Sequence, residues 1–181
     1  PLGRLVEERI ESGGTVRTIA YGYDAVGNRT QRVDSSAGTT AYTYDANDRL
    51  LSAGTTAYAY DQAGQRLQAS GPTGTTSYAW DPFGRLRAVD DGTHQVAYTY
   101  DALGMRTATS IDGSVAERYL VDAARALPQV VCTTDGAGAN PTSFLHGSGL
   151  ARLSRAGAAF ALHADATLNT RHLTNAAGAI S

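Results

Sequence analysis

The chain has 181 residues, and its 15 arginines nearly balance 17 acidic side chains, for a formal net charge of -2. That length fits one domain, and a charge so close to neutral excludes a general nucleic-acid binder, which needs a basic face. No stretch approaches the roughly 18 apolar residues of a membrane-spanning helix. Cys132 is the single cysteine, which excludes an internal disulfide.

A tyrosine–aspartate phrase recurs five times along the first part of the chain. It reads YGYDAVGNR at residues 21–29, and then YTYDANDR, YAYDQAGQR, YAWDPFGR and YTYDALGMR. The repeated aspartates are Asp24, Asp45, Asp61, Asp81 and Asp101. Their period near 20 predicts a repeat architecture, which acts through extended surfaces rather than one cleft. The opening PLGRL resembles the tail of a further copy, so we expect this chain to be part of a longer one.

Each repeat has the pattern of a β-hairpin. In TTAYTY, the residues Thr40, Tyr42 and Tyr44 fall on one side of an extended chain, and β-branched and aromatic residues at period two favour a strand. A second strand is expected to begin at the arginine of each repeat, giving a meander of antiparallel strands. The first strands are predicted near residues 19–23, 39–44, 55–60, 75–80 and 95–100. The Ala-rich stretch 115–126 is the place where a short helix or an irregular turn is most expected.

The turn between the two strands has its own residue pattern. The third residue after each aspartate is glycine in four copies and aspartate in one, which predicts a left-handed backbone at that position. The repeated aspartate is expected to accept hydrogen bonds from backbone N–H groups of its turn. A Ca²⁺ ladder is the functional alternative, but it needs six to eight oxygens per ion, and one aspartate per repeat supplies too few.

The count from aspartate to arginine alternates between five and four. It is five from Asp24 to Arg29, four from Asp45 to Arg49, and continues in the same order to Arg106. This alternation predicts long and short turns in strict succession, with the extra residue absorbed by a glycine-containing bulge. The structural unit is then a pair of hairpins.

The aromatic residues form two columns in successive repeats. Stacked repeats would bring each column into a ladder of aromatic pairs, with Tyr42, Tyr58, Tyr78 and Tyr98 mostly buried against one another. The opposite face carries small residues such as Ala41 and Thr43. An exposed aromatic row that stacks on sugar rings is the alternative. The motif residues, to which we assign a structural role, are Tyr21, Tyr23, Asp24, Gly27, Arg29, Tyr42, Tyr44, Asp45, Asp48, Arg49, Tyr58, Tyr60, Asp61, Gly64, Arg66, Tyr78, Trp80, Asp81, Gly84, Arg85, Tyr98, Tyr100, Asp101, Gly104 and Arg106.

These phrases resemble the YD repeats of the Rhs and teneurin group. The resemblance covers residues 1–119, which we take as a YD-repeat hairpin array. Residues 120–181 are expected to hold degenerate repeats, because residues 162–181 resemble the Rhs-core segment written YHTDxLGSxRxLTDxxG. His163, Asp165, Arg171, Leu173, Thr174 and Gly178 match that segment, whereas Leu162, Leu168 and Asn175 depart from it. The resemblance implies an all-β fold, in which antiparallel hairpins form a spiralling sheet that is a segment of a hollow β-shell.

The resemblance also implies functions. Such shells hold a C-terminal toxin in Rhs and toxin-complex proteins, and they serve adhesion at the cell surface in teneurins and wall-associated bacterial proteins. We therefore expect a secreted or cell-surface bacterial protein. Asp81-Pro82-Phe83-Gly84 is similar to the DPxG phrase of the aspartyl self-cleavage site of Rhs shells, but it lies in phase with the other repeats and lacks a paired carboxylate, so it is interpreted as a turn.

No catalytic or cofactor motif accompanies the repeats. His94, His146, His163 and His172 are scattered without helical metal-ligand spacing. His163 and Asp165 would share a strand face, which is interpreted as a hydrogen-bonded pair. The sequence therefore predicts a structural protein with no cofactor and no metal. The expected partners are the rest of the parent chain and an encapsulated toxin domain, with glycans or identical subunits paired through open strand edges as alternatives.

Overall fold

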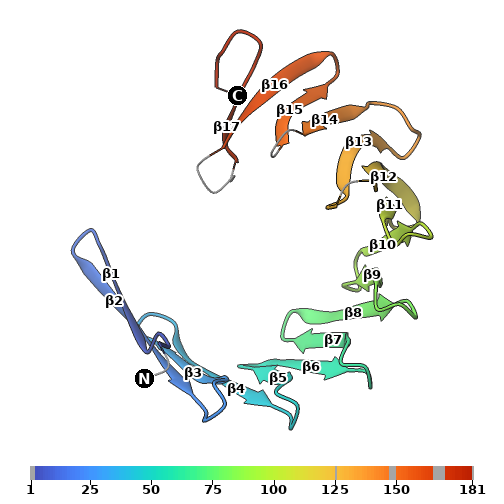
Figure 1. The fold of residues 1–181 in the computed structure, drawn as a ribbon. Coiled ribbons are helices and arrows are strands. Elements are labelled where there is room, and N and C mark those ends of the chain that lie inside the picture. Colours follow the sequence, from blue (N-terminus) through green and yellow to red (C-terminus); the bar gives the residue numbers. More distant parts are fainter. Residues whose placement is uncertain (1–2, 125, 147–149, 165–169, 181) are drawn as a thin grey trace. The chain divides into compact units, whose positions relative to one another are not determined.

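The computed structural model describes residues 3–124, 126–146, 150–164 and 170–180 of the chain. These residues form seventeen β-strands and no helix, so the described residues also contain no helix that is long and apolar enough to cross a bilayer (Figure 1). The first eight strands are β1 (Glu7–Ser12), β2 (Thr15–Tyr23), β3 (Arg29–Asp34), β4 (Gly38–Tyr44), β5 (Leu50–Ala53), β6 (Thr56–Tyr60), β7 (Arg66–Gly71) and β8 (Gly74–Trp80). The others are β9 (Leu86–Asp90), β10 (Gln95–Tyr100), β11 (Arg106–Ile111), β12 (Ser114–Asp122), β13 (Gln129–Asp135), β14 (Thr142–His146), β15 (Leu150–Arg155), β16 (Ala158–Ala164) and β17 (Thr170–Thr174).

The chain divides into two units. The first comprises Pro1–Arg85 with Asp90–Gly92, and the second comprises Leu86–Val89 with Thr93–Ser181. In the first unit, each strand from β1 to β8 pairs antiparallel with the next strand in the chain. In the second unit, the strands from β10 to β17 follow the same rule. Both units are therefore meanders of hairpins, and the predicted all-β repeat fold is confirmed.

The two faces of these strands are buried unequally. In β4, Thr40, Tyr42 and Tyr44 are half-buried, whereas Ala41 and Thr43 are exposed. The alternation predicted from TTAYTY is therefore confirmed. Burial is shallow throughout, because the apolar residues that are fully buried within the described part of the chain are Ile19 and Ala108. The fold is therefore stabilised mainly by hydrogen bonds and by contacts between neighbouring repeats, rather than by a packed apolar core.

The five motif turns share one backbone geometry. The N–H of each repeated aspartate donates to the carbonyl of the fourth residue after it, at 2.9–3.0 Å, as Asp24 does to Asn28 and Asp45 to Arg49. The predicted left-handed position is also confirmed in every copy. The φ values are 110° at Gly27, 60° at Asp48, 84° at Gly64, 77° at Gly84 and 83° at Gly104.

The predicted alternation of long and short turns is wrong. Tyr23 pairs with Arg29 and Tyr44 pairs with Leu50, so both turns return the chain after the same number of residues. The register then shifts by one residue in both hairpins, and the same shift follows the pairs Tyr60–Arg66 and Tyr100–Arg106. A bulge is therefore present in each of these hairpins. What alternates is the position of the arginine, which is the fourth or the fifth residue after the aspartate.

Two smaller expectations also need correction. The second strand begins at the repeat arginine in β3, β7 and β11, but at the leucine that follows it in β5 and β9. In the Ala-rich stretch 115–126, the expected irregular backbone is present only at residues 123–124 and 126, whereas β12 keeps the stretch extended as far as Asp122 and the described residues there form no helix. Val115 and Glu117 belong to the pairing of β12 with β11, which accounts for the extended backbone there.

Candidate functional site

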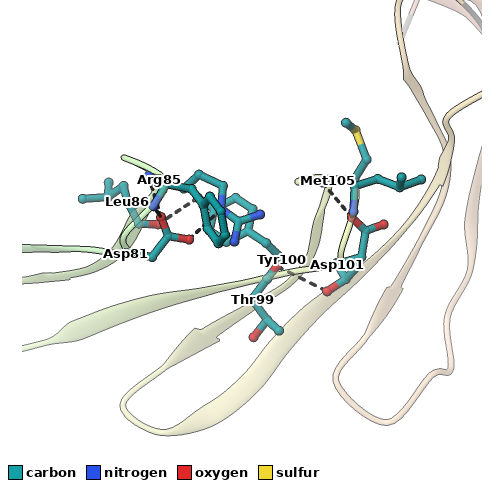
Figure 2. Close-up of polar contacts among 10 residues, drawn as sticks. Asp81, Arg85, Leu86, Thr99, Tyr100, Asp101 and Met105 are labelled. Carbon is teal, nitrogen blue, oxygen red and sulfur yellow. Dashed lines mark hydrogen bonds and ion pairs between the residues drawn. The ribbon is translucent and has the colours of Figure 1, made fainter.

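The repeated aspartate holds its own turn together. Oδ1 of Asp24 accepts hydrogen bonds from the backbone N–H groups of Gly27 and Asn28 at 2.7 and 2.8 Å. Oδ1 of Asp45 accepts from Asn47 and Arg49, both at 2.9 Å. The bond from the N–H of the fourth residue recurs at Asp61, Asp81 and Asp101, and Asp81 and Asp101 also accept from the second residue. Figure 2 shows Asp81 beside Arg85 and Asp101 beside Met105. The predicted hydrogen bonds from backbone N–H groups of the turn are therefore present at all five carboxylates.

These bonds act on the carboxylate as well as on the turn. The N–H of Arg49 that donates to Asp45 lowers the pKa of this carboxyl, and this effect exceeds the opposing effect of desolvation. The Arg49 guanidinium adds to it, because Nε lies 2.6 Å from Oδ2 of Asp45. A carboxylate that is already bonded to backbone N–H groups is a poor general acid at neutral pH.

The second aromatic residue of each motif joins its repeat to the preceding one. The hydroxyl of Tyr44 donates to the backbone carbonyl of Arg29 at 2.9 Å, five residues after the aspartate of the previous copy. The acceptor has the same position for three later copies, where Tyr60 donates to Leu50, Trp80 to Arg66 and Tyr100 to Leu86, at 2.8–2.9 Å. Tyr23 donates at 2.8 Å to Leu5, which directly follows the arginine of PLGRL. Trp80 makes the same bond through Nε1, which explains why tryptophan can replace tyrosine in this column.

The first aromatic column is organised by arginine. The guanidinium of Arg29 lies 5.8 Å from the ring centre of Tyr21 and 4.4 Å from that of Tyr42 in the next repeat. Arg66 lies in the same way between Tyr58 and Tyr78, at 5.7 and 4.5 Å, and Arg106 between Tyr98 and Tyr119, at 5.3 and 4.8 Å. Each cation–π contact at such partly exposed sites contributes about 0.5–1 kcal/mol.

The predicted ladder of stacked aromatic rings is therefore wrong. Among the residues that the structure describes, no ring-on-ring stack involves Tyr42, Tyr58, Tyr78 or Tyr98, and all four are half-buried rather than mostly buried. The physical reason, at every second step of the column, is that the arginine at the fifth position after the aspartate places its guanidinium between two rings, as Arg29 does between Tyr21 and Tyr42. A cation on the ring face is favoured by the ring quadrupole, and the planar guanidinium can pack flat against it.

An arginine at the fourth position acts differently. Arg49 forms an ion pair with Asp45 of its own turn, and it also reaches forward to the next repeat, where it lies 5.4 Å from the ring of Tyr60 and donates to the carbonyl of Asp61 at 3.2 Å. Arg4 makes the matching forward contacts, with the Tyr23 ring at 5.7 Å and the Asp24 carbonyl at 3.3 Å. The segment PLGRL thus contains an arginine of this second kind.

One buried charge cluster was not foreseen from the sequence. Asp34 is 2% exposed and accepts hydrogen bonds from Arg17, Arg32 and the backbone N–H of Ser36. The pairing with Arg17 is the largest cause of a pKa well below the ordinary range for this carboxyl. Neither arginine belongs to the repeated phrase, so the repeat pattern gave no indication of the cluster.

Two further turns of the motif type lie in the last third of the chain. The backbone N–H of Asp135 donates to the carbonyl of Ala139 at 2.9 Å, and Oδ1 of Asp135 accepts from the N–H of Ala139 at 2.8 Å. Gly138 in this turn has a φ of 84°. Asn175 and Gly178 form the same turn. Asn175 stands where the Rhs-core segment has aspartate, whereas the turn at Asp135 was not predicted, although the spacing Asp-x-x-Gly after an alternating strand could have revealed it.

The structure describes only some of the residues that were compared with the Rhs-core segment. Asp165 and Leu168 lie outside the described residues, so the predicted His163–Asp165 pair cannot be compared with the structure. Among the described residues, His163 contacts Thr174 and the ring of His172. Cys132 is half-buried and donates to the carbonyl of Thr133. Within the described ranges, no three histidine, cysteine, aspartate or glutamate side chains gather as a metal-binding group.

Antiparallel hairpins joined through a repeated tyrosine, aspartate and arginine define a YD-repeat protein. The chain belongs to the teneurin YD-shell family, whose model matches residues 2–115. No curated protein sequence is significantly similar to it.

Solved structures of toxin-complex proteins have a similar fold. A crystal structure of TcdB2-TccC3-TEV has 14% sequence identity and a TM-score of 0.62 over 90% of this chain. TcdB2-TccC3 without its hypervariable C-terminal region has 15% identity and a TM-score of 0.60 over 89%. The Tc holotoxin pore of Photorhabdus luminescens has 14% identity and a TM-score of 0.53 over 90%. This chain spans about a tenth of the length of these proteins, at 10%, 10% and 9%.

Proposed function

We propose that this chain is a non-catalytic structural segment of a YD-repeat β-shell. The observation that carries the proposal is the bond from the second aromatic residue to the carbonyl of the preceding repeat, which recurs in five copies. Each motif side chain with a known partner is bonded within its own turn or to a neighbouring repeat. Such a pattern serves the continuity of an array rather than the binding of a substrate.

In this proposal the motif aspartates are structural and do not act as catalytic groups. Asp81, which lies in the phrase similar to the DPxG self-cleavage site, has Oδ1 bonded to the N–H groups of Phe83 and Arg85 and Oδ2 2.6 Å from Nε of Arg85. Partial desolvation opposes ionisation of this carboxyl, but the hydrogen bonds outweigh it and lower its pKa. Aspartyl chemistry needs a second carboxylate that shares a proton with the first, whereas Asp81 is paired with a cation.

The main partner in this proposal is the remainder of a parent chain, which with this segment would enclose a toxin domain. The small size of the segment supports a need for further repeats, because it spans about a tenth of the toxin-complex proteins with a similar fold. One of those structures is described as being without its hypervariable C-terminal region. By analogy with the toxin-complex proteins of similar fold, the parent is a secreted or cell-surface bacterial protein. Within this chain, the division between residues 119 and 120 separates the regular repeats from the degenerate ones.

Protease protection in the parent chain tests this function. The parent would be expressed to its natural C-terminus, and the rate at which a protease cuts the region after Ser181 would be compared with the rate for that region expressed alone. Protection of at least tenfold is expected if a shell encloses it. Equal rates, or flanking sequence without further YD repeats, would contradict the proposal.

Matched variants show whether the repeat contacts matter for enclosure. Tyr44→Phe with Tyr60→Phe removes two hydroxyls that bond to the preceding repeat, so protection should fall. Tyr42→Phe with Tyr58→Phe removes two hydroxyls of the first column, for which the described structure provides no hydrogen-bond partner, so protection should be unchanged. Pairing of open strand edges between identical copies stays a prediction, and negative-stain images of the purified chain would reveal filaments if it occurs.

A further inference from the structure

Two histidines that are nine residues apart in the sequence lie side by side in the second unit. His163 of β16 is directly opposite His172 of β17 in the antiparallel pairing. Their ring centres are 4.5 Å apart and their planes differ by 13°. The scattered histidine spacing could not indicate this pair, because it is the hairpin register that brings the two rings together.

Both rings are accessible, and one of them is already oriented. His163 and His172 are exposed to solvent. Nε2 of His163 lies 2.8 Å from Oγ1 of Thr174, in hydrogen-bond contact. This contact leaves Nδ1 of His163 as the nitrogen that can bind a cation. Histidines that bind metals commonly use their other ring nitrogen in this way, which fixes the ring orientation.

We propose that His163 and His172 form a two-histidine site for a divalent transition cation such as Zn²⁺ or Cu²⁺. Imidazole nitrogen suits these cations, and the strand register already holds the two ligands close together. Because a ring nitrogen binds a cation in its own ring plane, the stacked rings turn about their side-chain torsions when both nitrogens face one cation. A structural zinc site normally has four protein ligands. Here water or an external ligand fills the other positions, and binding joins β17 to β16 through side chains as well as the backbone. The site is independent of the proposed shell function.

Titration calorimetry of the purified chain at pH 7.5 tests the site. We expect one cation per chain, with Cu²⁺ binding more tightly than Zn²⁺, as the general order of divalent affinities requires. His163→Ala and His172→Gln should each weaken binding at least tenfold. His94→Ala is the matched control, because it removes an exposed histidine that contacts Asp112 instead of a second histidine, and it should leave binding unchanged.

A second variant and a second measurement separate binding from folding. Thr174→Val removes the contact that orients His163 and should weaken Zn²⁺ binding on the order of tenfold, at the lower end of the range for such supporting residues. In NMR spectra of the unaltered chain, the ring protons of His163 and His172 should shift together during the titration, while those of His146 should not. Binding that survives both histidine substitutions, or ring shifts that spare this pair, would overturn the proposal.

Discussion

The hydroxyl of Tyr44 donates a hydrogen bond to the backbone carbonyl of Arg29 at 2.9 Å, and so joins the second YD repeat to the first. The bond lies outside the strand pairing, and it uses a carbonyl at the point where β3 begins. Because the equivalent bond recurs along the array, the second aromatic column contributes to stability through its polar atom as well as its ring.

Replacement of this hydroxyl should be measurable in isolation. Tyr44→Phe keeps the ring and removes the donor, so the free energy of unfolding should fall by about 1 kcal/mol, the typical net contribution of one hydrogen bond. Tyr58→Phe is the control, because the described structure shows no hydrogen bond from its hydroxyl, and it should change stability by less than about 0.5 kcal/mol. Urea denaturation measures both, and equal losses in the two variants would show that the columns do not differ in this way.

The left-handed turn position predicts unequal effects on stability for two substitutions. Gly64→Val places a β-branched residue at a φ of 84° and should cost about 1–3 kcal/mol from backbone strain alone, since a Cβ there would meet no atom closer than 3.9 Å. Asp48→Gly relieves a φ of 60° but loses the contact with Asn28 at 2.7 Å, so stability should be nearly unchanged. Denaturant midpoints that rank the two variants the other way would contradict the turn assignment.

Acid should destabilise the chain through its bonded carboxylates, with Asp34 as the main contributor. The folded-state pKa of Asp34 is lowered chiefly by Arg17, so its stabilisation is present above the unfolded-state pKa of about 3.9 and is lost as the pH falls below it. Unfolding free energies should therefore begin to fall at about pH 4 and fall more steeply as the pH decreases further toward the lowered folded-state pKa. Asp34→Asn should be less stable at pH 7 and should lose less on acidification. A slope unchanged by the substitution would exclude Asp34 as the source.

Truncation of Tyr78 separates a structural column from a sugar platform. Arg66 lies 4.5 Å from the Tyr78 ring and the residue is half-buried, so Tyr78→Ala should cost about 2 kcal/mol, less than the 3–5 kcal/mol of a fully buried aromatic residue. One ring face is already in contact with the guanidinium, which leaves less surface for a sugar ring. Stability and glycan-array binding would be measured on the same variant. Unchanged stability with lost glycan binding would favour the adhesion alternative.

A steric contact in the second unit predicts a large effect at a glycine without a left-handed backbone. A Cβ at Gly136 would lie 1.7 Å from the carbonyl oxygen of Val115, whereas a Cβ at Gly138, whose φ is 84°, would meet nothing within 4 Å. Gly136→Ala should therefore cost more than Gly138→Ala, and about 3 kcal/mol or more, at the upper end for overpacking. Thermal unfolding of the two variants gives the comparison, and a greater loss from Gly138→Ala would contradict it.

Local features of this fold could be predicted from the sequence because each depends on residues close together in the chain. Strand alternation follows from the side-chain period of two, and the left-handed position follows from glycine at a fixed distance from Asp24 and its equivalents. Bonds within a turn, such as those of Asp45, have the same local origin.

Contacts between repeats could not be predicted in the same way. The site of Arg29 between two tyrosine rings depends on the distance between neighbouring hairpins, and the cluster of Asp34 with Arg17 depends on strand pairing. The error about turn length has a similar cause. An added residue before the arginine looks like a longer turn, but the hydrogen bond from Asp24 to Asn28 fixes the turn and leaves the arginine one position further along the strand.

The alternating arginine positions constrain how such an array can change its length during evolution. Arg29 contacts tyrosine rings on both sides, whereas Arg49 pairs with its own Asp45 and reaches forward to Tyr60. Deletion of a single hairpin would bring two arginines of one kind together and leave one set of contacts incomplete. Duplication or loss of two hairpins preserves every contact at the junction. Gene rearrangements within this array should therefore add or remove hairpins in even numbers.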